Sequence, residues 1–231
     1  VMLVSMYTMK ALDFAAFRRA ADAGGSKLLV DMAHFAGLVA GGAHEQPFPH
    51  ADIVTTTTYK SLRGPRGAII LWNDEALRKR INLAVFPGLQ GTPFLQIVAA
   101  KAVALGEALR PEFPRYAAAV LANARALAGT LQRQGFDLVG GGTDTPLMLV
   151  DLRAKGLTGA PAAQSLERAG IVANMNPIPS DAVDLKVMSG LRFGVSGATT
   201  RGLGVAEFEV LGCLIAEVLE GLRARPDDNV A

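Results

Sequence analysis

Short apolar runs separated by helical segments constrain the fold of the first third of the chain. A helix is predicted from its N-cap, Asp13, to the breaking pair Gly24 and Gly25. Four runs are apolar or rich in β-branched residues, which favour strands: Val1–Val4, Leu28–Val30, Ile53–Thr58 and Ala68–Trp72. Continuous apolar runs that alternate with helices predict an α/β domain whose sheet is covered on both faces.

The rest of the chain is predicted to begin with two long helices and to continue as a second α/β unit. Pro93–Leu109 and Pro114–Gln134 are rich in alanine and leucine, which favour helices. Strands are expected at Phe136–Val139, Leu147–Asp151, Ile171–Asn174 and Leu191–Val195, and a helix at Ala160–Ala169. A closing helix has an apolar face made of Val205, Phe208, Leu211, Ile215, Val218 and Leu222. We expect two domains, residues 1–109 and 110–231, with the long helices as a bridge.

Composition and charge narrow the class of protein. Half of the 231 residues are hydrophobic and 19% are charged, as in folded globular proteins. The formal net charge of +2 is too small to indicate nucleic acid or an acidic membrane as a partner. No apolar run reaches membrane-spanning length, and no signal-peptide pattern is present. The single cysteine, Cys213, suits a reducing compartment, and no metal site is expected from three histidines and one cysteine.

The chain starts at Val1, directly inside the first apolar run. A strand needs neighbours to pair its backbone groups. We therefore expect further residues upstream of Val1; a trimmed sequence with its natural start nearby is the alternative.

The densest chemical signal is the segment Thr55–Gly67, in which four threonines end a strand and lead to Lys60 and a Gly/Pro-rich turn. Asp31 ends the preceding apolar run. Ligands of open α/β sheets bind beyond the carboxyl ends of the strands, where both residues are expected. A lysine near an aspartate and threonine hydroxyls suits a Schiff base to an aldehyde cofactor. A solvated loop lysine is the ordinary alternative, and the Gly-x-x-x-x-Gly-Lys phosphate loop is absent.

Long motifs follow one another in a fixed order over nearly all of the chain: Asp31–Ala40, Thr55–Gly67, Val85–Gly91, Ala99–Ala104, Gly141–Asp144, Val150–Leu152, Gly156–Gly159, Ser189–Arg192 and Thr199–Gly202. Together they resemble the serine hydroxymethyltransferase family. The resemblance implies an α/β fold of the aspartate-aminotransferase type (fold type I), which depends on pyridoxal 5'-phosphate (PLP). This chain would hold part of the large domain and then the small C-terminal α/β domain.

The resemblance also implies the residues of the cofactor site. Lys60 would hold PLP covalently, and Asp31 would bind its pyridine nitrogen. His34 would lie near the phenolic oxygen of the ring, and Thr57 would orient the lysine when the substrate amine displaces it. Gly91 would approach the cofactor phosphate of a neighbouring subunit. Ser5 lies near a family serine that bonds the cofactor, although the segment that follows it aligns poorly.

Three further residues are implied for the substrates. Arg192 would form a bidentate pair with the amino-acid carboxylate. Arg66 would sit behind the lysine, and Asn176 falls where the family contacts folate. Taken without the resemblance, Arg192 reads more simply as a surface charge on an edge strand, and His34 as a satisfied buried histidine.

Departures from the family pattern leave the reaction open. Tyr59 replaces the histidine before the lysine, Thr92 replaces a glycine beside the phosphate, and Gln96 replaces a histidine. Thr145-Pro146 and Met175 also differ from the pattern. A tyrosine beside the lysine changes size and proton chemistry, and a threonine adds bulk where the backbone must come close.

The expected function is a hydroxymethyltransferase that interconverts serine and glycine, with tetrahydrofolate as the one-carbon acceptor. Two alternatives stay open. One is a same-fold aldolase, transaldolase or α-methylserine hydroxymethyltransferase acting on another β-hydroxy amino acid. The other is an inactive paralogue that serves as a binding subunit. The resemblance further implies a cytoplasmic homodimer or dimer of dimers, and we expect the fragment alone to bind PLP poorly and not to turn over.

Overall fold

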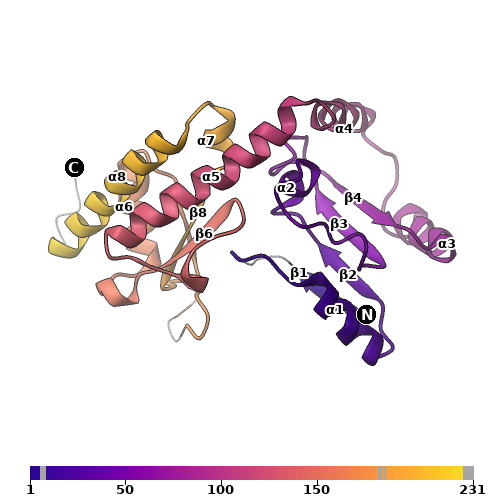
Figure 1. Ribbon diagram of the computed structural model, residues 1–231, viewed down its shortest axis with the longest axis horizontal. Coiled ribbons are helices and arrows are strands. Elements are labelled where there is room, and N and C mark those ends of the chain that lie inside the picture. Colours follow the sequence, from indigo (N-terminus) through magenta and orange to yellow (C-terminus); the bar gives the residue numbers. More distant parts are fainter. Residues whose placement is uncertain (6–8, 182–183, 185, 226–231) are drawn as a thin grey trace. The chain divides into compact units, whose positions relative to one another are not determined.

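The computed structural model describes residues 1–5, 9–181, 184 and 186–225 (Figure 1). The chain divides into two compact units, Val1–Ala117 and Ala118–Ala231. The division falls inside helix α5 (Glu112–Arg133). The domain boundary that the sequence predicts, between residues 109 and 110, lies just before this helix. The division into two domains at that point stays a prediction.

The described strands of the first unit form a sheet in the order β1-β2-β3-β4 (Figure 1). β1 (Met2–Ser5), β2 (Leu28–Asp31) and β3 (Ile53–Thr57) are parallel, whereas β4 (Ala68–Trp72) is antiparallel to β3. The strands lie where the sequence predicts them, to within one residue at either end. The carboxyl ends of three parallel strands therefore meet at one edge of the sheet.

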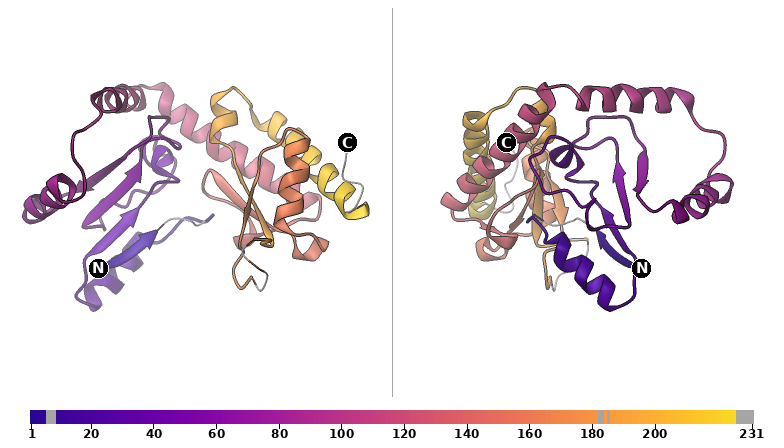
Figure 2. Two further views of the ribbon diagram at one scale, coloured as in Figure 1. Left: turned by 180° about the vertical axis from the view of Figure 1, so that it is seen from behind. Right: turned by 45° about the vertical axis from the view of Figure 1, so that its right-hand side comes forward.

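Helices connect these strands and follow β4. α1 (Phe14–Ala23) begins at Asp13, whose carboxylate accepts a hydrogen bond from the Ala16 N–H as the sequence predicts. Short α2 (Ala36–Ala40) follows β2, and after β4 come α3 (Glu75–Leu83), the π-helical turn η1 (Ala84–Leu89) and α4 (Leu95–Ala108), which Figure 2 shows from two further sides. α3 and η1 are not predicted by the sequence pattern.

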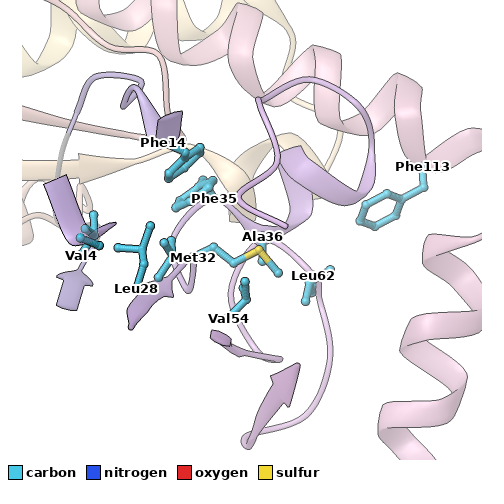
Figure 3. Packing of buried hydrophobic residues seen from close by; sticks show 11 residues of the cluster. Val4, Phe14, Leu28, Met32, Phe35, Ala36, Val54, Leu62 and Phe113 are labelled. Carbon is cyan, nitrogen blue, oxygen red and sulfur yellow. The ribbon is translucent and has the colours of Figure 1, made fainter. Parts of the chain in front are cut away.

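The core of the first unit lies beside β1, β2 and β3. Phe14 of α1 stacks on Phe35, with ring centroids 6.3 Å apart. The same cluster includes Val4, Leu28, Val30, Met32, Ala36, Val54 and Leu62 (Figure 3). β4 is less covered, because Ala68 is exposed and the Ile70 side chain is 38% exposed. The prediction of two covered faces thus fails at β4 within the described residues.

The second unit contains an antiparallel sheet in the order β5-β6-β8-β7. β6 (Leu147–Asp151) lies where the sequence predicts it, and β8 (Gly190–Gly194) starts one residue early. β5 is only Asp137–Leu138, because the 3-10 turn η2 (Val139–Gly141) follows at once, with Gly140 at φ 76°. β7 is Asn174–Asn176 rather than Ile171–Asn174, since the left-handed Gly170 and the 82% exposed Val172 still belong to the turn after α6 (Gly159–Arg168).

Helices α5 and α8 (Val205–Ala224) pack together in the second unit. A Cβ on Gly212 of α8 would lie 2.7 Å from the Thr130 methyl of α5, so the glycine allows this close approach. Of the predicted apolar face of α8, Phe208, Ile215 and Leu222 are buried. Val205 is 45% exposed, contrary to prediction, because it occupies the first turn of the helix.

A 3-10 turn, η3 (Arg153–Lys155), and a short helix, α7 (Ser196–Thr200), complete the elements described in this unit. No helix within the described ranges is both long and apolar enough to cross a membrane.

Candidate cofactor site at the carboxyl edge of the parallel strands

The register of the parallel strands brings the predicted residues Ser5 and Asp31 to the same level of the sheet. The backbone of Ser5 pairs with Asp31, and Asp31 pairs with Thr55 of β3. All three positions lie at or near the carboxyl ends of their strands, which is where ligands of such sheets bind. The sequence prediction of a shared edge for Asp31 and the threonine segment is therefore confirmed.

The carboxylate of Asp31 is oriented by one donor from the neighbouring strand and one from the turn that follows it. Its Oδ1 accepts a hydrogen bond from the Thr55 hydroxyl at 3.2 Å and from the Ala33 N–H at 3.2 Å. The Met32 N–H donates to the Thr55 carbonyl at 2.9 Å, which continues the pairing beyond the strand. Both recorded side-chain contacts go to Oδ1, so the carboxylate has a defined orientation at the edge of the sheet.

Thr58 closes the segment that carries Lys60 into a compact loop. Its N–H donates to the Gly67 carbonyl at 3.0 Å, and its carbonyl accepts from the Gly64 N–H at 2.8 Å. Its hydroxyl donates to the Pro65 carbonyl at 2.6 Å. Thr58 is 2% exposed, so the threonine end of each of these bonds is shielded from water. Thr58 therefore joins the start of the loop to residues 64, 65 and 67 near its end.

The Tyr59 ring lies close to two cations, Arg66 and the half-buried Lys60. The Lys60 ammonium lies 5.3 Å from the centroid of the Tyr59 ring, and the Arg66 guanidinium carbon lies 4.9 Å from it. Both distances fall in the range of cation–π attraction. The tyrosine that departs from the family pattern thus contacts both cations predicted for the site.

Two predicted residues have buried polar atoms without a hydrogen-bond partner in the described part of the chain. They are the Thr57 hydroxyl and the Asn176 side-chain oxygen. Buried polar groups are normally satisfied, and exceptions call for an explanation such as a missing ligand. The two atoms lie in different units, and each could form a hydrogen bond with a bound ligand.

His34 lies half-buried in the turn between β2 and α2, and its carbonyl accepts a hydrogen bond from the Ser61 hydroxyl at 3.5 Å. The sequence does not single out three residues that make contacts near this turn: Ser61, Gly37 and Tyr116. The Ser61 hydroxyl accepts from the Gly37 N–H at 2.9 Å, and the Tyr116 hydroxyl donates to the Ser61 carbonyl at 3.3 Å. These contacts join the turn after Asp31 to the turn after Lys60.

Arg192 and Asn176 belong to the second unit. Arg192 lies in the middle of β8, paired with Leu149 of β6 on one side and with Asn174 of β7 on the other. The reading of Arg192 as an edge-strand charge is therefore wrong. Asn176 pairs with Gly190 on the same pair of strands, so two of the three residues predicted to contact substrates lie on neighbouring strands.

Gly91 has few neighbours in the first unit. It lies in the exposed loop between η1 and α4, and an added Cβ there would meet no described atom within 4 Å. Its predicted contact is with a neighbouring subunit, and it stays a prediction.

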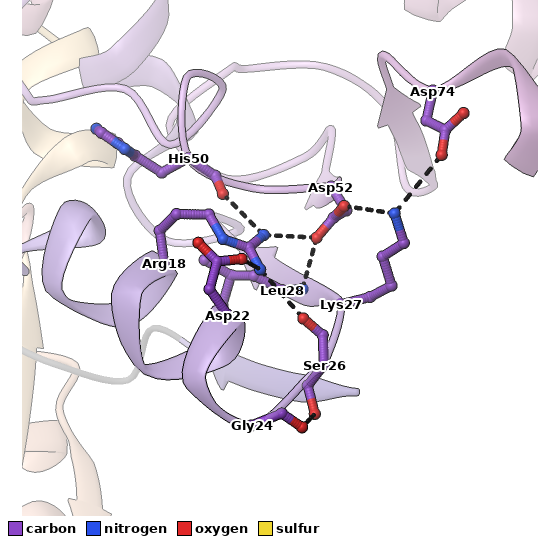
Figure 4. A network of polar contacts seen from close by, with 9 residues as sticks. All are labelled: Arg18, Asp22, Gly24, Ser26, Lys27, Leu28, His50, Asp52 and Asp74. Atoms are coloured by element: carbon purple, nitrogen blue, oxygen red, sulfur yellow. Dashed lines mark hydrogen bonds and ion pairs between the residues drawn. The ribbon is translucent and has the colours of Figure 1, made fainter.

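A charged network holds the opposite, amino ends of β2 and β3. Asp52 accepts hydrogen bonds from Arg18 at 2.7 Å, from Lys27 at 2.9 Å and from the Leu28 N–H at 2.8 Å (Figure 4). Burial of the carboxyl opposes ionisation, but these donors outweigh it and lower the pKa of Asp52 to about 2. The network ties α1 to the sheet and serves the fold, away from the carboxyl edge.

A cavity of about 570 Å³ lies elsewhere in the first unit, between β4, α3, η1 and α4. Its walls include Trp72, Phe86 and Lys101. None of the residues predicted to contact the cofactor or substrates lines it. The candidate cofactor site is therefore defined by the edge of the sheet and not by this cavity.

Comparison with known proteins gives a consistent result. The family model for serine hydroxymethyltransferase matches residues 1–215. The serine hydroxymethyltransferase of Paramagnetospirillum magneticum is 58% identical over 222 residues, which are 96% of this chain and 52% of that protein. Serine hydroxymethyltransferase 2 of Ralstonia nicotianae is 58% identical over 227 residues, 98% of this chain and 53% of that protein. The serine hydroxymethyltransferase of Rhodopseudomonas palustris is 60% identical over 218 residues, 94% of this chain and 50% of that protein.

The chain spans about half the length of the curated relatives it matches. The match confirms the fold class expected from the sequence, an α/β enzyme fold of the PLP-dependent type I. Dependence on PLP in general follows from the same match.

Proposed function

Because the chain belongs to the serine hydroxymethyltransferase family, we propose that the whole protein interconverts serine and glycine with tetrahydrofolate as the one-carbon acceptor. The observation that carries the proposal is the edge where Asp31 is oriented by Thr55 and where the closed loop presents Lys60. The resemblance assigns these positions to PLP, and the edge of parallel strands is the place where the fold binds ligands.

The residues present fit PLP. Thr57 offers a buried hydroxyl that finds no partner among the described residues, as expected of a group that contacts a ligand. Asp31 offers an oriented carboxylate to a protonated ring nitrogen, and Lys60 offers the amine that would hold the cofactor covalently. When bound, PLP supplies an electron sink for the bond broken at the substrate's Cα.

In this proposal the chain's own residues bind, orient and hold protons. Asp31 would keep a proton on the pyridine nitrogen, and the resemblance places His34 near the phenolic oxygen. Thr57 would orient the Lys60 amine, while Ser5 and Gly91 would contribute to cofactor binding, the latter toward a neighbouring subunit.

The substrate is held by charge and by hydrogen bonds. The planar guanidinium of Arg192 suits a bidentate pair with the amino-acid carboxylate. Arg66 lies beside the Tyr59 ring and, as the resemblance implies, would sit behind the lysine. Asn176 has a buried amide oxygen with no partner in the described part of the chain, which supports its proposed contact with folate.

We further propose that the whole protein is a homodimer or a dimer of dimers and works in the cytoplasm, as the resemblance implies. The 231 residues alone are expected to bind PLP poorly and not to turn over. A serine-to-glycine assay of this piece is therefore no test of the function.

The test uses the full-length protein purified with PLP. Glycine formation from L-serine is measured with and without tetrahydrofolate. Strict dependence on the folate supports the proposal and makes Tyr59 a tolerated variation. An absence of serine turnover, with activity on α-methylserine or threonine instead, would move the assignment to a sibling reaction of the same fold. No activity with any of these amino acids would favour an inactive paralogue.

A further inference from the structure

Ser61, the residue after Lys60, is held on more than one side. It is 2% exposed, its hydroxyl accepts from the Gly37 N–H at 2.9 Å, and the same hydroxyl donates to the His34 carbonyl at 3.5 Å. Gly37 leaves no room for a side chain, since a Cβ there would lie 2.6 Å from the Ser61 carbonyl carbon. The start of α2 is thus packed tightly against the peptide group between Ser61 and Leu62, one residue beyond the lysine.

Helix α5 holds the same stretch of backbone from another element. The Tyr116 hydroxyl donates to the Ser61 carbonyl at 3.3 Å. The Arg63 guanidinium carbon lies 4.3 Å from the Tyr116 ring centroid and 5.4 Å from that of Phe113. Arg63 has a left-handed backbone at φ 60°, and its N–H donates to the Lys60 carbonyl at 2.8 Å. The carbonyls of Lys60 and Ser61 are therefore both occupied by donors.

These contacts matter because the lysine side chain is long and flexible, so the place its amine can reach depends on a fixed backbone. We propose that Ser61 and Tyr116 are positioning residues for Lys60. They hold the backbone beside the lysine against α2 and α5, and so set how fast its amine reacts with PLP. In that reaction a bond forms between the lysine nitrogen and the aldehyde carbon of PLP, and the aldehyde oxygen leaves as water. The inference rests on the proposed function of Lys60.

The experiment measures the rate constant for Schiff-base formation when PLP is added to the cofactor-free full-length protein, followed by absorbance. Ser61→Ala removes one hydroxyl with two recorded contacts. Ser165→Ala is the matched control, since Ser165 is 3% exposed and its hydroxyl donates to the Pro161 carbonyl at 2.8 Å in the second unit. Tyr116→Phe removes the contact to the Ser61 carbonyl but keeps the ring under Arg63.

The expected result is a rate constant about fivefold lower for Ser61→Ala and about threefold lower for Tyr116→Phe, as the loss of an ordinary hydrogen bond predicts. Ser165→Ala should lower the melting temperature to a similar extent as Ser61→Ala, yet leave the rate constant unchanged. A purely structural role for Ser61 would give the two serine variants the same kinetics, and that result would overturn the inference.

Two further outcomes are informative. Should Ser61→Ala fail to fold, Tyr116→Phe decides the matter, and a rate constant equal to that of the unsubstituted protein would overturn the inference. If the unsubstituted protein formed no Schiff base at all, the proposed function would fall, and with it the inference. The two failures are therefore distinguishable.

Discussion

Replacing Gly37 by alanine tests whether the close approach between α2 and the turn after Lys60 is real. The added Cβ would lie 2.6 Å from the carbonyl carbon of Ser61 and 2.8 Å from the Cβ of Ser61. It would lie closer still to the Ser61 carbonyl oxygen. Favourable separations between carbon atoms are about 3.5–4.0 Å. Two of the atoms in the way are backbone, so no side-chain rotation can relieve the clash.

The magnitude follows from two opposing effects. Overpacking of a filled interior typically costs about 1–3 kcal/mol, and the rigid neighbours of Gly37 favour the upper end of that range. Alanine gains up to about 1 kcal/mol over glycine within a helix. The net expectation is a loss of about 2 kcal/mol in the free energy of unfolding, together with slower reaction of Lys60 with PLP because the Ser61 peptide must shift.

The assay is a comparison of urea midpoints and melting temperatures for the full-length protein and its variants. Gly221→Ala is the matched control, because Gly221 lies in α8 and an added Cβ would meet no described atom within 4 Å. It should leave stability unchanged or raise it slightly. A Gly37→Ala variant as stable as Gly221→Ala, with unchanged PLP kinetics, would refute the packing described between α2 and Ser61.

Three other substitutions probe the two units. Asp52→Asn should lower the free energy of unfolding at pH 7 by about 1–2 kcal/mol and make it depend less on acid pH. The pKa of Asp52 is lowered from 3.8 to about 2, so its contribution to stability is present above pH 4 and is lost as the pH falls toward 2. Parallel pH profiles of parent and variant in urea unfolding would contradict this. Asn123→Ala should lower the free energy of unfolding by about 2–3 kcal/mol in the same assay, since the buried amide donates to the Thr199 hydroxyl and the Leu203 carbonyl at 2.9 Å each. A loss below about 0.5 kcal/mol would argue against those bonds. Arg192→Lys should raise the KM for serine about tenfold or more while PLP absorbance stays unchanged. The reason is that lysine lacks the planar guanidinium group that can form two parallel hydrogen bonds with a carboxylate. An unchanged KM would show that Arg192 does not bind the substrate carboxylate.

The sequence predicts those parts of the fold whose signals are local. The Asp13 cap, the strand that ends at Asp31 and the strand Leu147–Asp151 are found as predicted, since N-cap chemistry and apolar runs are read from neighbouring residues. α3 was not predicted, because none of its residues is buried and its pattern lacks an apolar face of the usual width. β7 is displaced because turn residues after Gly170 are as apolar as a strand.

The site divides in the same way. Asp31 and Lys60 could be placed at strand ends from the sequence, whereas the depth of Arg192 within the sheet depends on strand order, which is a tertiary property. The contacts of Ser61 with Gly37 and Tyr116 join residues 24 and 55 positions apart, and no local pattern marks them. The sequence motifs contain Gly37 and Ser61, but the motifs alone do not indicate that these two residues contact each other.

The proposed function rests most directly on Lys60 as the residue that would hold PLP. The measurement is to incubate the full-length protein with PLP, reduce it with borohydride, digest it and locate the pyridoxyl group by mass spectrometry. We expect the label on Lys60, and its loss in a Lys60→Ala variant whose far-ultraviolet circular dichroism is unchanged. A label on another lysine such as Lys101, or no label on the folded protein, would contradict it.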